Sequence, residues 1–370
     1  MDKKWLLPPA WALSVQEDWL RMPWHLRHHH LRTVGGMLMF AILAWNLKTF
    51  LYLSIVGKIH TSPPQPLTIL VWSWPFHTPQ NLSMDVCATR YSIPNCWLTI
   101  NHSTFSQADV VVFHHKELVP GGLELLLEKK PPGQVWVWAT IESPSHTRGL
   151  DALNHTFFNW TMTYRRDSEI FVPYGWLVPQ NLHSFEIPNK TGLVAWVISH
   201  YKRVHARSVY FQKLSAHIKV DVYGRAAKKP LCSTCLLPTV SKYKFYLAFE
   251  NSIHRDYITE KMWVNAFAAG AVPVVLGPPR ANYEHFVPGD AFIHVDDFAS
   301  PEELALFLKT MNSSRYREYF RWRENYRLTG YTDWVERFCS ICSKYPRLPQ
   351  GKAYRDVRGW FWDRGGQSLL

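Results

Sequence analysis

The sequence predicts an α/β protein with two Rossmann-like lobes and a cleft between them, preceded by one transmembrane helix. Short apolar stretches alternate with helical ones, the periodicity breaks before residue 192, and an apolar run of 25 residues precedes both lobes. A length of 370 residues fits two domains, and 47% hydrophobic residues exclude a disordered chain. The net charge of +12 fits nucleic acid, an anionic membrane or an acidic substrate.

Seven short stretches are rich in β-branched and aromatic residues and are predicted to be strands. Some are apolar throughout, which is typical of strands buried on both faces of a parallel sheet. The strands are expected at 67–74, 109–113, 135–141, 193–198, 219–223, 243–249 and 272–276. Helices are expected at 201–217, 257–269 and 301–311, the last opened by Ser300 and Pro301.

Residues 173–191 show no clear periodicity and are interpreted as an interdomain connection. This boundary gives a first lobe at 67–191 and a second lobe, with a C-terminal segment, at 192–370. In doubly wound sheets a ligand binds beyond the carboxyl ends of the strands.

The apolar run at 33–57 is long enough to span a bilayer. A cleavable signal peptide and a buried core helix are the alternatives, but a leader of 32 residues argues against a signal peptide. Arginines and histidines precede the run, which predicts a cytoplasmic tail at 1–32, a signal anchor at 33–57 and a stem at 58–66. Both lobes would then lie in the lumen, in a single-pass type II topology.

Sequons for N-glycosylation are more frequent than chance predicts, and all follow the apolar run. The six asparagines are Asn81, Asn101, Asn154, Asn159, Asn189 and Asn312. A lumenal protein does not meet nucleic acid, so the positive charge must serve another anionic partner.

The six cysteines fall into three doublets: Cys87 and Cys96, Cys232 and Cys235, and Cys339 and Cys342. The two CxxC doublets are too far apart for a zinc ribbon, and neither convincingly begins a helix after a strand, as a redox motif would. Disulfides are therefore expected. Bridges within each doublet are the simplest arrangement, while cross-links from the first doublet to the last remain an alternative.

Residues 243–279 carry the strongest chemical signal. An apolar strand ends in Phe-Glu-Asn-Ser, and a helix is expected to begin near Asp256 as N-cap. Tyr257, Glu260 and Lys261 would then share one helical face, and the helix N-terminus would be a natural site for a diphosphate. The alternative is an ordinary surface pair on an amphipathic helix.

The run FENSIHRDYITEK, followed by NAFAAGAVPVVLGPP, resembles the donor-binding signature of the α-1,3-fucosyltransferases, which form glycosyltransferase family 10. VWVWATIESPSH, YRRDSEIFVPYG and FCSICSKYP are similar to this family across nearly the whole region after the stem. VFHHKEL and HVDDF are most similar to the branch that forms sialyl Lewis x.

This resemblance implies a GT-B fold, GDP-fucose as donor, inversion at the fucose anomeric carbon and no prosthetic group. The acceptor would be a sialylated N-acetyllactosamine on glycoproteins or glycolipids, and the enzyme would make selectin ligands for leukocyte adhesion at the Golgi membrane. Unsialylated lactosamine is the alternative acceptor.

The family's donor-binding residues match Arg207, Asn251, Tyr257, Glu260 and Lys261. The general base of the family matches Glu142, which follows the strand expected at 135–141. A catalytically silent membrane lectin would be expected to have lost part of this set, and all of it is present.

No Asp-x-Asp motif stands at a strand end of the second lobe, and Asp296 and Asp297 resemble a structural segment of the family. No bound metal is therefore expected, and Mn²⁺ would only stimulate turnover. His114, His115 and His146 are expected to pack or to contact the acceptor. The sequence gives no indication of oligomeric state.

Overall fold

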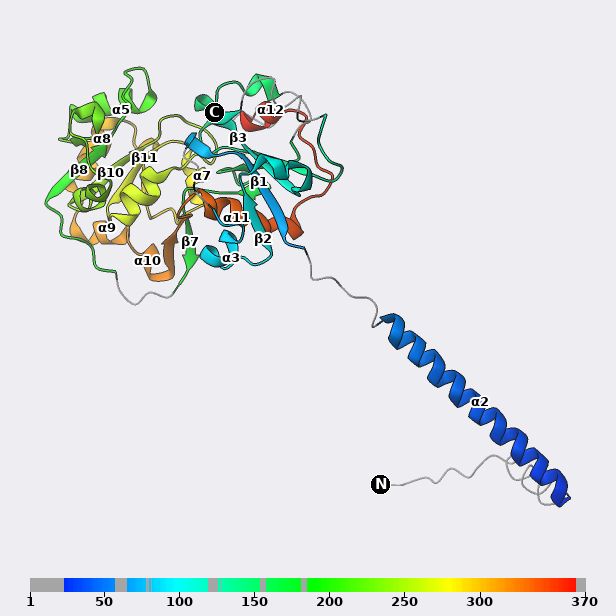
Figure 1. Ribbon diagram of the computed structural model, residues 1–370. Helices are drawn as coiled ribbons and strands as arrows, with labels where there is room; N and C mark the ends of the chain where they lie inside the picture. The colour runs from blue at the N-terminus through cyan, green and yellow to red at the C-terminus, as the bar shows by residue number, and fades with distance from the viewer. Residues whose placement is uncertain are drawn as a thin grey trace, which may run out of the picture. The chain divides into compact units, whose positions relative to one another are not determined.

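The computed structural model describes residues 23–56, 65–77, 80, 82–118, 126, 128–153, 158–180 and 185–363. The chain divides into two units, Met1–Gln65 and Pro66–Leu370. In the first unit, helix α2 spans Trp24–Val56 (Figure 1). Among the helices of the described residues, none combines the length and the apolar character needed to cross a membrane. Residues 1–22 of the predicted tail and 58–64 of the predicted stem lie outside the described residues.

A six-stranded parallel sheet forms the first lobe, in the order β2-β1-β3-β4-β5-β6. Its strands are β1 (Leu67–Ser73), β2 (Cys96–Thr99), β3 (Val110–His114), β4 (Val135–Ala139), β5 (Trp160–Thr163) and β6 (Ile170–Phe171). Every residue of β3 and β4 is buried, as the apolar runs at these positions predict.

Alternate residues of this sheet face two different cores, because side chains alternate along a strand. One face packs against α3 (Val86–Tyr91) and α11 (Trp334–Lys344). The other face packs against α12 (Val357–Phe361), where Phe361 lies edge-on to Trp138. The C-terminal segment therefore packs on the first lobe, although it lies within the range 192–370 that was assigned to the second lobe and its C-terminal segment.

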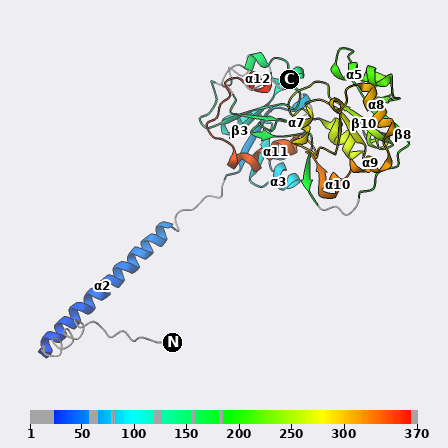
Figure 2. The same ribbon diagram turned by 180° about the vertical axis from the view of Figure 1, so that it is seen from behind.

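A five-stranded parallel sheet forms the second lobe, in the order β12-β11-β10-β8-β9. Its strands are β8 (Gly192–Val197), β9 (Asp221–Tyr223), β10 (Tyr243–Phe249), β11 (Val272–Leu276) and β12 (Ile293–His294). Figures 1 and 2 show this sheet beside α5 (Ala206–Ser215), α8 (Pro301–Thr310) and α9 (Ser313–Glu318). These three helices pack against one face, and α6 (Leu236–Val240), the π-helix η8 (Lys261–Ala268) and α7 (Arg280–Glu284) pack against the other.

A small antiparallel sheet pairs β7 (Trp176–Pro179) with β13 (Tyr326–Thr329), next to α10 (Trp322–Asn325). The segment at 173–191 was expected to be only a connection, yet it contains β7. The partner strand lies about 150 residues further along the chain, so local periodicity carried no sign of the pairing.

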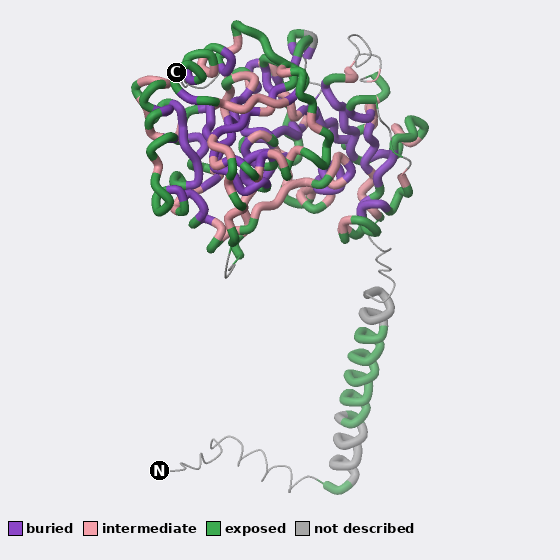
Figure 3. The backbone as a smooth tube through the Cα atoms, turned by 90° about the vertical axis from the view of Figure 1, so that its left-hand side faces the viewer, coloured by how far each residue is buried: buried purple, intermediate pink, exposed green. Residues whose placement is uncertain are grey.

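All seven predicted strands are present, with ends shifted by up to two residues. The helix predicted from Pro301 is also confirmed, because the Ser300 hydroxyl accepts a hydrogen bond from the Glu303 N–H at 3.2 Å. Buried backbone is concentrated in the interior of the second unit (Figure 3). The two parallel sheets, each with helices packed against it, therefore confirm the two Rossmann-like lobes.

Two disulfides tie the C-terminal helix α11 to the first lobe. Cys87 is bonded to Cys339 and Cys96 to Cys342, while Cys232 is bonded to its neighbour Cys235. Bridges within each doublet are thus wrong for two of the three doublets, and the cross-link alternative is confirmed. The reason is that α3 and β2 lie against α11 in the same apolar core.

Candidate active site

Glu142 lies three residues beyond the end of β4, as the strand prediction implied. Its backbone N–H donates to the Thr140 hydroxyl at 3.2 Å, which turns the chain out of the sheet. The carboxyl group is half-buried, and this burial raises its pKa. The positive charge of Lys261 opposes the rise, the negative charge of Glu260 adds to it, and a hydrogen bond from Tyr257 lowers it again. A first-lobe carboxyl group therefore lies within electrostatic range of second-lobe residues.

The predicted helix start at Asp256 is wrong. Asp256 has a left-handed backbone with φ of 60°, and the helix that follows, η8, begins only at Lys261. The Asp256 carboxylate accepts from the Arg166 N–H and the Asn282 amide, so it is not available to cap a helix. Tyr257, Glu260 and Lys261 consequently do not share one helical face. The side chain of Tyr257 is buried, whereas that of Glu260 is exposed.

Lys261 is held by a buried carboxylate that the sequence interpretation missed. Its Nζ lies 3.1 Å from Glu250 Oε2, and it donates to Thr259 Oγ1 at 2.7 Å and to Glu260 Oε1 at 3.2 Å. Burial lowers the pKa of Lys261, but Glu250 and Glu260 outweigh it, so the pKa is raised and the ammonium stays charged. Burial also raises the pKa of the Glu250 carboxyl. The available signal was a carboxylate placed directly after an apolar strand.

Arg207 lies in the first turn of α5 and is buried. Its Nη2 donates to the His200 carbonyl at 2.5 Å, whereas its Nε has no hydrogen-bond partner among the described residues. The buried Ser208 hydroxyl and His205 Nδ1 are likewise unpaired there. Unpaired donors at the N-terminus of a helix favour an anion.

His146 of the first lobe is affected by cations of the second lobe. Burial lowers its pKa, and the charges of Arg207, Lys202 and Lys261 lower it further. Its ring centroid lies 6.5 Å from that of His205. Second-lobe cations therefore act together beside a first-lobe histidine, and an anion bound among them would relieve their mutual repulsion.

The two lobes also meet through short hydrogen bonds beside this cluster. Ser252 Oγ donates to Ser143 Oγ at 2.7 Å and contacts Asn251 Oδ1 at 3.2 Å. Asn251 and Glu142 each directly precede one of these two hydrogen-bonded serines in the chain. Glu142, Asn251, Tyr257, Glu260, Lys261 and Arg207 are brought into one region by these contacts and by their mutual charge interactions.

The remaining histidines and aspartates named from the sequence have structural contacts. His114 Nδ1 forms a buried hydrogen bond with the Glu117 carboxyl group, and His115 Nε2 contacts the Arg148 carbonyl at 2.7 Å. Asp297 pairs with Arg280. Among the residues described, no cluster of three or more His, Cys, Asp or Glu side chains could hold a metal ion.

The sequons differ in their surroundings. Asn101, Asn189 and Asn312 are exposed, and Asn81 and Asn154 lie outside the described residues. The Asn159 side chain accepts from Lys130 Nζ and from the Trp136 N–H, each at 2.9 Å, and donates to the Lys352 carbonyl at 2.9 Å. Glycosylation of Asn159 would break these contacts, which the sequon pattern could not reveal.

Two parallel α/β lobes, with a carboxylate from one facing cations from the other, define the class: a glycosyltransferase for a donor with an anionic leaving group. Two family models match the chain, "Fucosyltransferase, N-terminal" at residues 64–175 and "Glycosyltransferase family 10 (fucosyltransferase) C-term" at residues 187–360. The chain belongs to glycosyltransferase family 10, the fucosyltransferases.

Relatives resemble the chain over nearly its whole length. Alpha-(1,3)-fucosyltransferase 7 of Bos taurus is 53% identical over 334 residues, covering 90% of this chain and 96% of its own. The protein of the same name from Homo sapiens is 53% identical over 335 residues, with the same coverage. A solved structure, "Crystal Structure of alpha1,3-Fucosyltransferase with GDP-fucose", is 17% identical with a TM-score of 0.51, covering 78% of this chain and 92% of that one. This last likeness supports the GT-B fold.

Proposed function

We propose that the chain transfers fucose from GDP-fucose to O3 of the N-acetylglucosamine in lactosamine glycans, with inversion at the fucose anomeric carbon. The observation that carries the proposal is the hydrogen bond between Ser143 and Ser252, which joins the chain beside Glu142 to the second-lobe loop and brings the Glu142 carboxyl within electrostatic range of Lys261. The relatives named alpha-(1,3)-fucosyltransferase 7 support the linkage, and the solved α1,3-fucosyltransferase with GDP-fucose supports the donor.

In the proposed reaction, the Glu142 carboxylate takes the proton of the acceptor hydroxyl while its oxygen attacks the anomeric carbon. The new glycosidic C–O bond forms as the bond between the anomeric carbon and the β-phosphate oxygen breaks. Arg207 and Lys261 stabilise the negative charge that builds on the departing GDP. Glu260, which is exposed beside Lys261, is placed to accept hydrogen bonds from fucose hydroxyls. No second acid is needed, because GDP leaves as a stable anion.

The acceptor is proposed to carry sialic acid. Lys116 is exposed just after β3, and its positive charge lowers the pKa of the Glu142 carboxyl, so a cation lies within electrostatic range of the proposed base. A sialic acid carboxylate would be attracted there, whereas an unsialylated acceptor would not. The product would then be of the sialyl Lewis x type.

One assay tests the donor, linkage and acceptor together. Purified full-length protein is given GDP-fucose with sialylated or unsialylated lactosamine, and the products are separated by linkage. Transfer to O3 is expected, with preference for the sialylated acceptor, and Lys116→Met should reduce only that preference. Binding of glycans without release of GDP would instead indicate a lectin.

We also propose a Golgi membrane location with both lobes in the lumen and the anchor at 33–57. Three disulfides and the exposed sequons support an oxidising, glycosylating compartment. Deglycosylation of protein made in secretory cells should reduce its mass, and alkaline carbonate should leave it in the membrane pellet. An unchanged mass would contradict the topology, and release by carbonate would contradict the anchor.

A further inference from the structure

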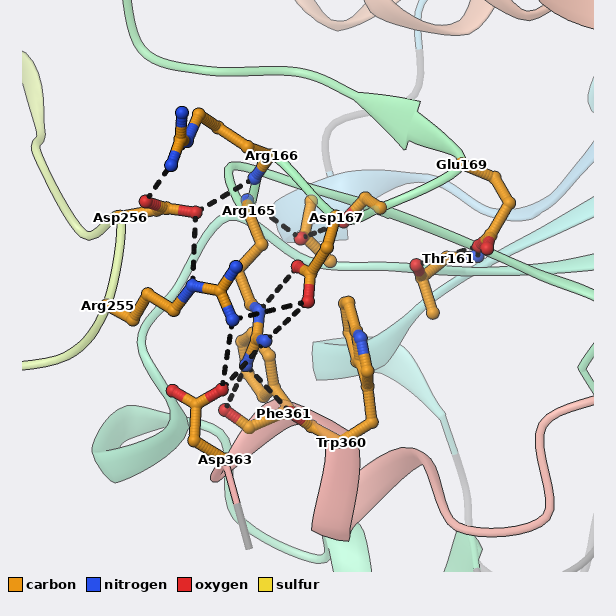
Figure 4. Close-up of polar contacts among 12 residues, drawn as sticks. Thr161, Arg165, Arg166, Asp167, Glu169, Arg255, Asp256, Trp360, Phe361 and Asp363 are labelled. Atoms are coloured by element: carbon orange, nitrogen blue, oxygen red, sulfur yellow. Dashed lines mark hydrogen bonds and ion pairs between the residues drawn. The ribbon is translucent and has the colours of Figure 1, made fainter. Parts of the chain in front are cut away.

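Three segments that are distant in sequence meet in a cluster of alternating charges (Figure 4). We call this cluster the clasp. It contains three arginines and three aspartates: Arg165, Arg166 and Asp167 between β5 and β6, Arg255 and Asp256 after β10, and Asp363 after α12. The six formal charges sum to zero. The clasp joins the first lobe, the second lobe and the C-terminal segment.

Arg165 is the centre of the clasp, with a side chain only 3% exposed. Its guanidinium donates to both carboxylate oxygens of Asp167, at 2.8 and 2.7 Å, and lies 2.8 Å from Asp363 Oδ1. Its Nη1 also donates to the Trp360 and Phe361 carbonyls, at 2.7 and 3.2 Å. This planar fork holds the end of α12 in a way that a lysine ammonium could not.

Asp256 is the second anchor, and its side chain is fully buried. Its carboxylate accepts from the Arg166 N–H at 3.0 Å and from the Asn282 amide at 2.7 Å, while Asn282 Oδ1 accepts from the Asp256 N–H at 2.7 Å. Arg255 lies 3.9 Å from the Asp256 carboxylate and 3.7 Å from those of Asp167 and Asp363. These contacts hold the left-handed backbone of Asp256, which a free chain would seldom adopt.

The clasp is directly connected to the candidate site. Tyr257, the residue after Asp256, lies edge-on to Tyr174 with ring centroids 6.4 Å apart, and the Tyr174 hydroxyl donates to the carbonyl of Ile141, the residue before Glu142, at 2.7 Å. Tyr164, the residue before Arg165, packs against Tyr257 with ring centroids 5.0 Å apart and against Phe361 at 6.0 Å. Polar and aromatic contacts therefore run in parallel from the C-terminal segment to the proposed base.

We propose that the clasp positions the loop at 250–260 against Glu142, so that Arg165, Asp256 and Asp363 act on fucosyl transfer through Tyr257. None of the three is expected to touch a substrate, so they are positioning residues. The inference rests on the proposed function, because transfer requires the base of one lobe to be correctly placed against the donor site of the other. A displacement of about 1 Å at such a site can slow a reaction on the order of a hundredfold.

The test compares two conservative variants with a matched surface control. Arg165→Lys keeps the charge but loses the fork. Asp256→Asn keeps the size and the tolerance for a left-handed backbone but loses the charge. Arg315→Lys makes the same change as the first variant in an exposed pair with Glu318 on α9. Each full-length protein is assayed for kcat, KM for GDP-fucose, GDP affinity, thermal midpoint and hydrogen exchange at 250–260.

Both clasp variants should lose at least about tenfold in kcat, with GDP affinity within about twofold of the parent, since the reacting groups are misplaced while the phosphate site remains. The acid limb of the rate against pH should also shift, because a displaced loop changes the surroundings of the Glu142 carboxyl. A purely structural clasp would lower the thermal midpoint and leave kcat per folded molecule and the pH profile unchanged, which would overturn the proposal.

Hydrogen exchange separates this proposal from the proposed function. If the parent protein transferred no fucose, the function would be wrong, while faster exchange at 250–260 in Arg165→Lys would still support the positioning role. Unchanged exchange and unchanged kcat would reject the clasp even if the parent were an active fucosyltransferase.

Discussion

The first lobe takes part of its core from the far end of the chain, whereas the second lobe is built almost wholly from one continuous stretch. Helices α11 and α12 cover the two faces of the first sheet, and two disulfides with sequence separations of 252 and 246 hold α11 in place. The second sheet is covered by helices between residues 206 and 318, and its one disulfide spans three residues. The folding of the first lobe, and with it the position of Glu142, therefore depends on disulfides between residues about 250 positions apart in the sequence.

The largest expected effect comes from removing the two disulfides that hold α11 on the first lobe. Replacing all four cysteines of Cys87–Cys339 and Cys96–Cys342 by serine should cost at least about 5 kcal/mol of unfolding free energy, because loops of this length lose the most entropy on closure. Replacing Cys87 and Cys339 alone should cost about 3 kcal/mol, since the neighbouring bridge still closes the long loop. Denaturant unfolding followed by tryptophan fluorescence measures both losses, and equal losses in the single-bridge and double-bridge variants would contradict this account.

The proposed base gives the next largest effect, and it tests the first lobe by chemistry. Glu142→Gln should lower kcat by about 10²–10⁴-fold, because the amide cannot take the acceptor proton. GDP affinity should stay within about twofold, since the phosphate-facing cations belong to the second lobe. The matched control is Glu302→Gln on the exposed start of α8. A Glu142 variant that kept more than a few per cent of the parent rate would reject the assignment.

The contrast between the lobes also explains what the sequence could and could not predict. The strands found from sequence are short runs rich in β-branched and aromatic residues, and such a pattern is local. The missed strands β2, β5, β6 and β12 are short, and β7 and β13 depend on one another across about 150 residues. The placement of α11 and the disulfide partners of Cys87 and Cys96 depend on contacts across about 250 residues, which a local periodicity cannot indicate.

The candidate site divides in the same way. The residues named from the resemblance meet in one region, but the predicted helix geometry around them was wrong, because Asp256 is bound by Arg166 and Asn282 rather than capping a helix. Glu250 was missed because its role depends on Lys261, eleven residues later, reaching back to it. The clasp joins three segments, so each of its charges resembled an ordinary surface residue in the sequence.

In the second lobe, Lys261 should matter for binding more than for folding of the whole chain. Lys261→Met should weaken GDP binding by about 1.5–3 kcal/mol, the value of a charge-assisted contact, whereas Lys309→Met on the exposed face of α8 should not. Lys261→Arg, which keeps the charge beside Glu250, should recover part of the affinity. Calorimetry measures all three, and unchanged affinity in the methionine variant of a folded protein would reject the phosphate contact.

The local disulfide of the second lobe is expected to contribute least to stability. Replacing Cys232 and Cys235 by serine should cost about 2 kcal/mol or less, because the closed loop is very short and the surrounding residues are largely exposed. The same denaturant experiment places this value beside those of the first lobe. A loss as large as that of the double-bridge variant would remove the difference drawn between the lobes.

The smallest expected effect is a shift in the pH dependence of the rate, caused by second-lobe charges that act on Glu142 of the first lobe. A general base works only when deprotonated, and burial raises the pKa of Glu142, so the rate should fall on acidification at a pH above the ordinary range of a glutamate. Lys261 lowers this pKa and Glu260 raises it. Lys261→Met should therefore move the acid limb of kcat/KM to higher pH, and Glu260→Gln should move it to lower pH. Movement in the same direction for both variants, or none for either, would show that the titrating group is not a first-lobe carboxylate exposed to second-lobe charges.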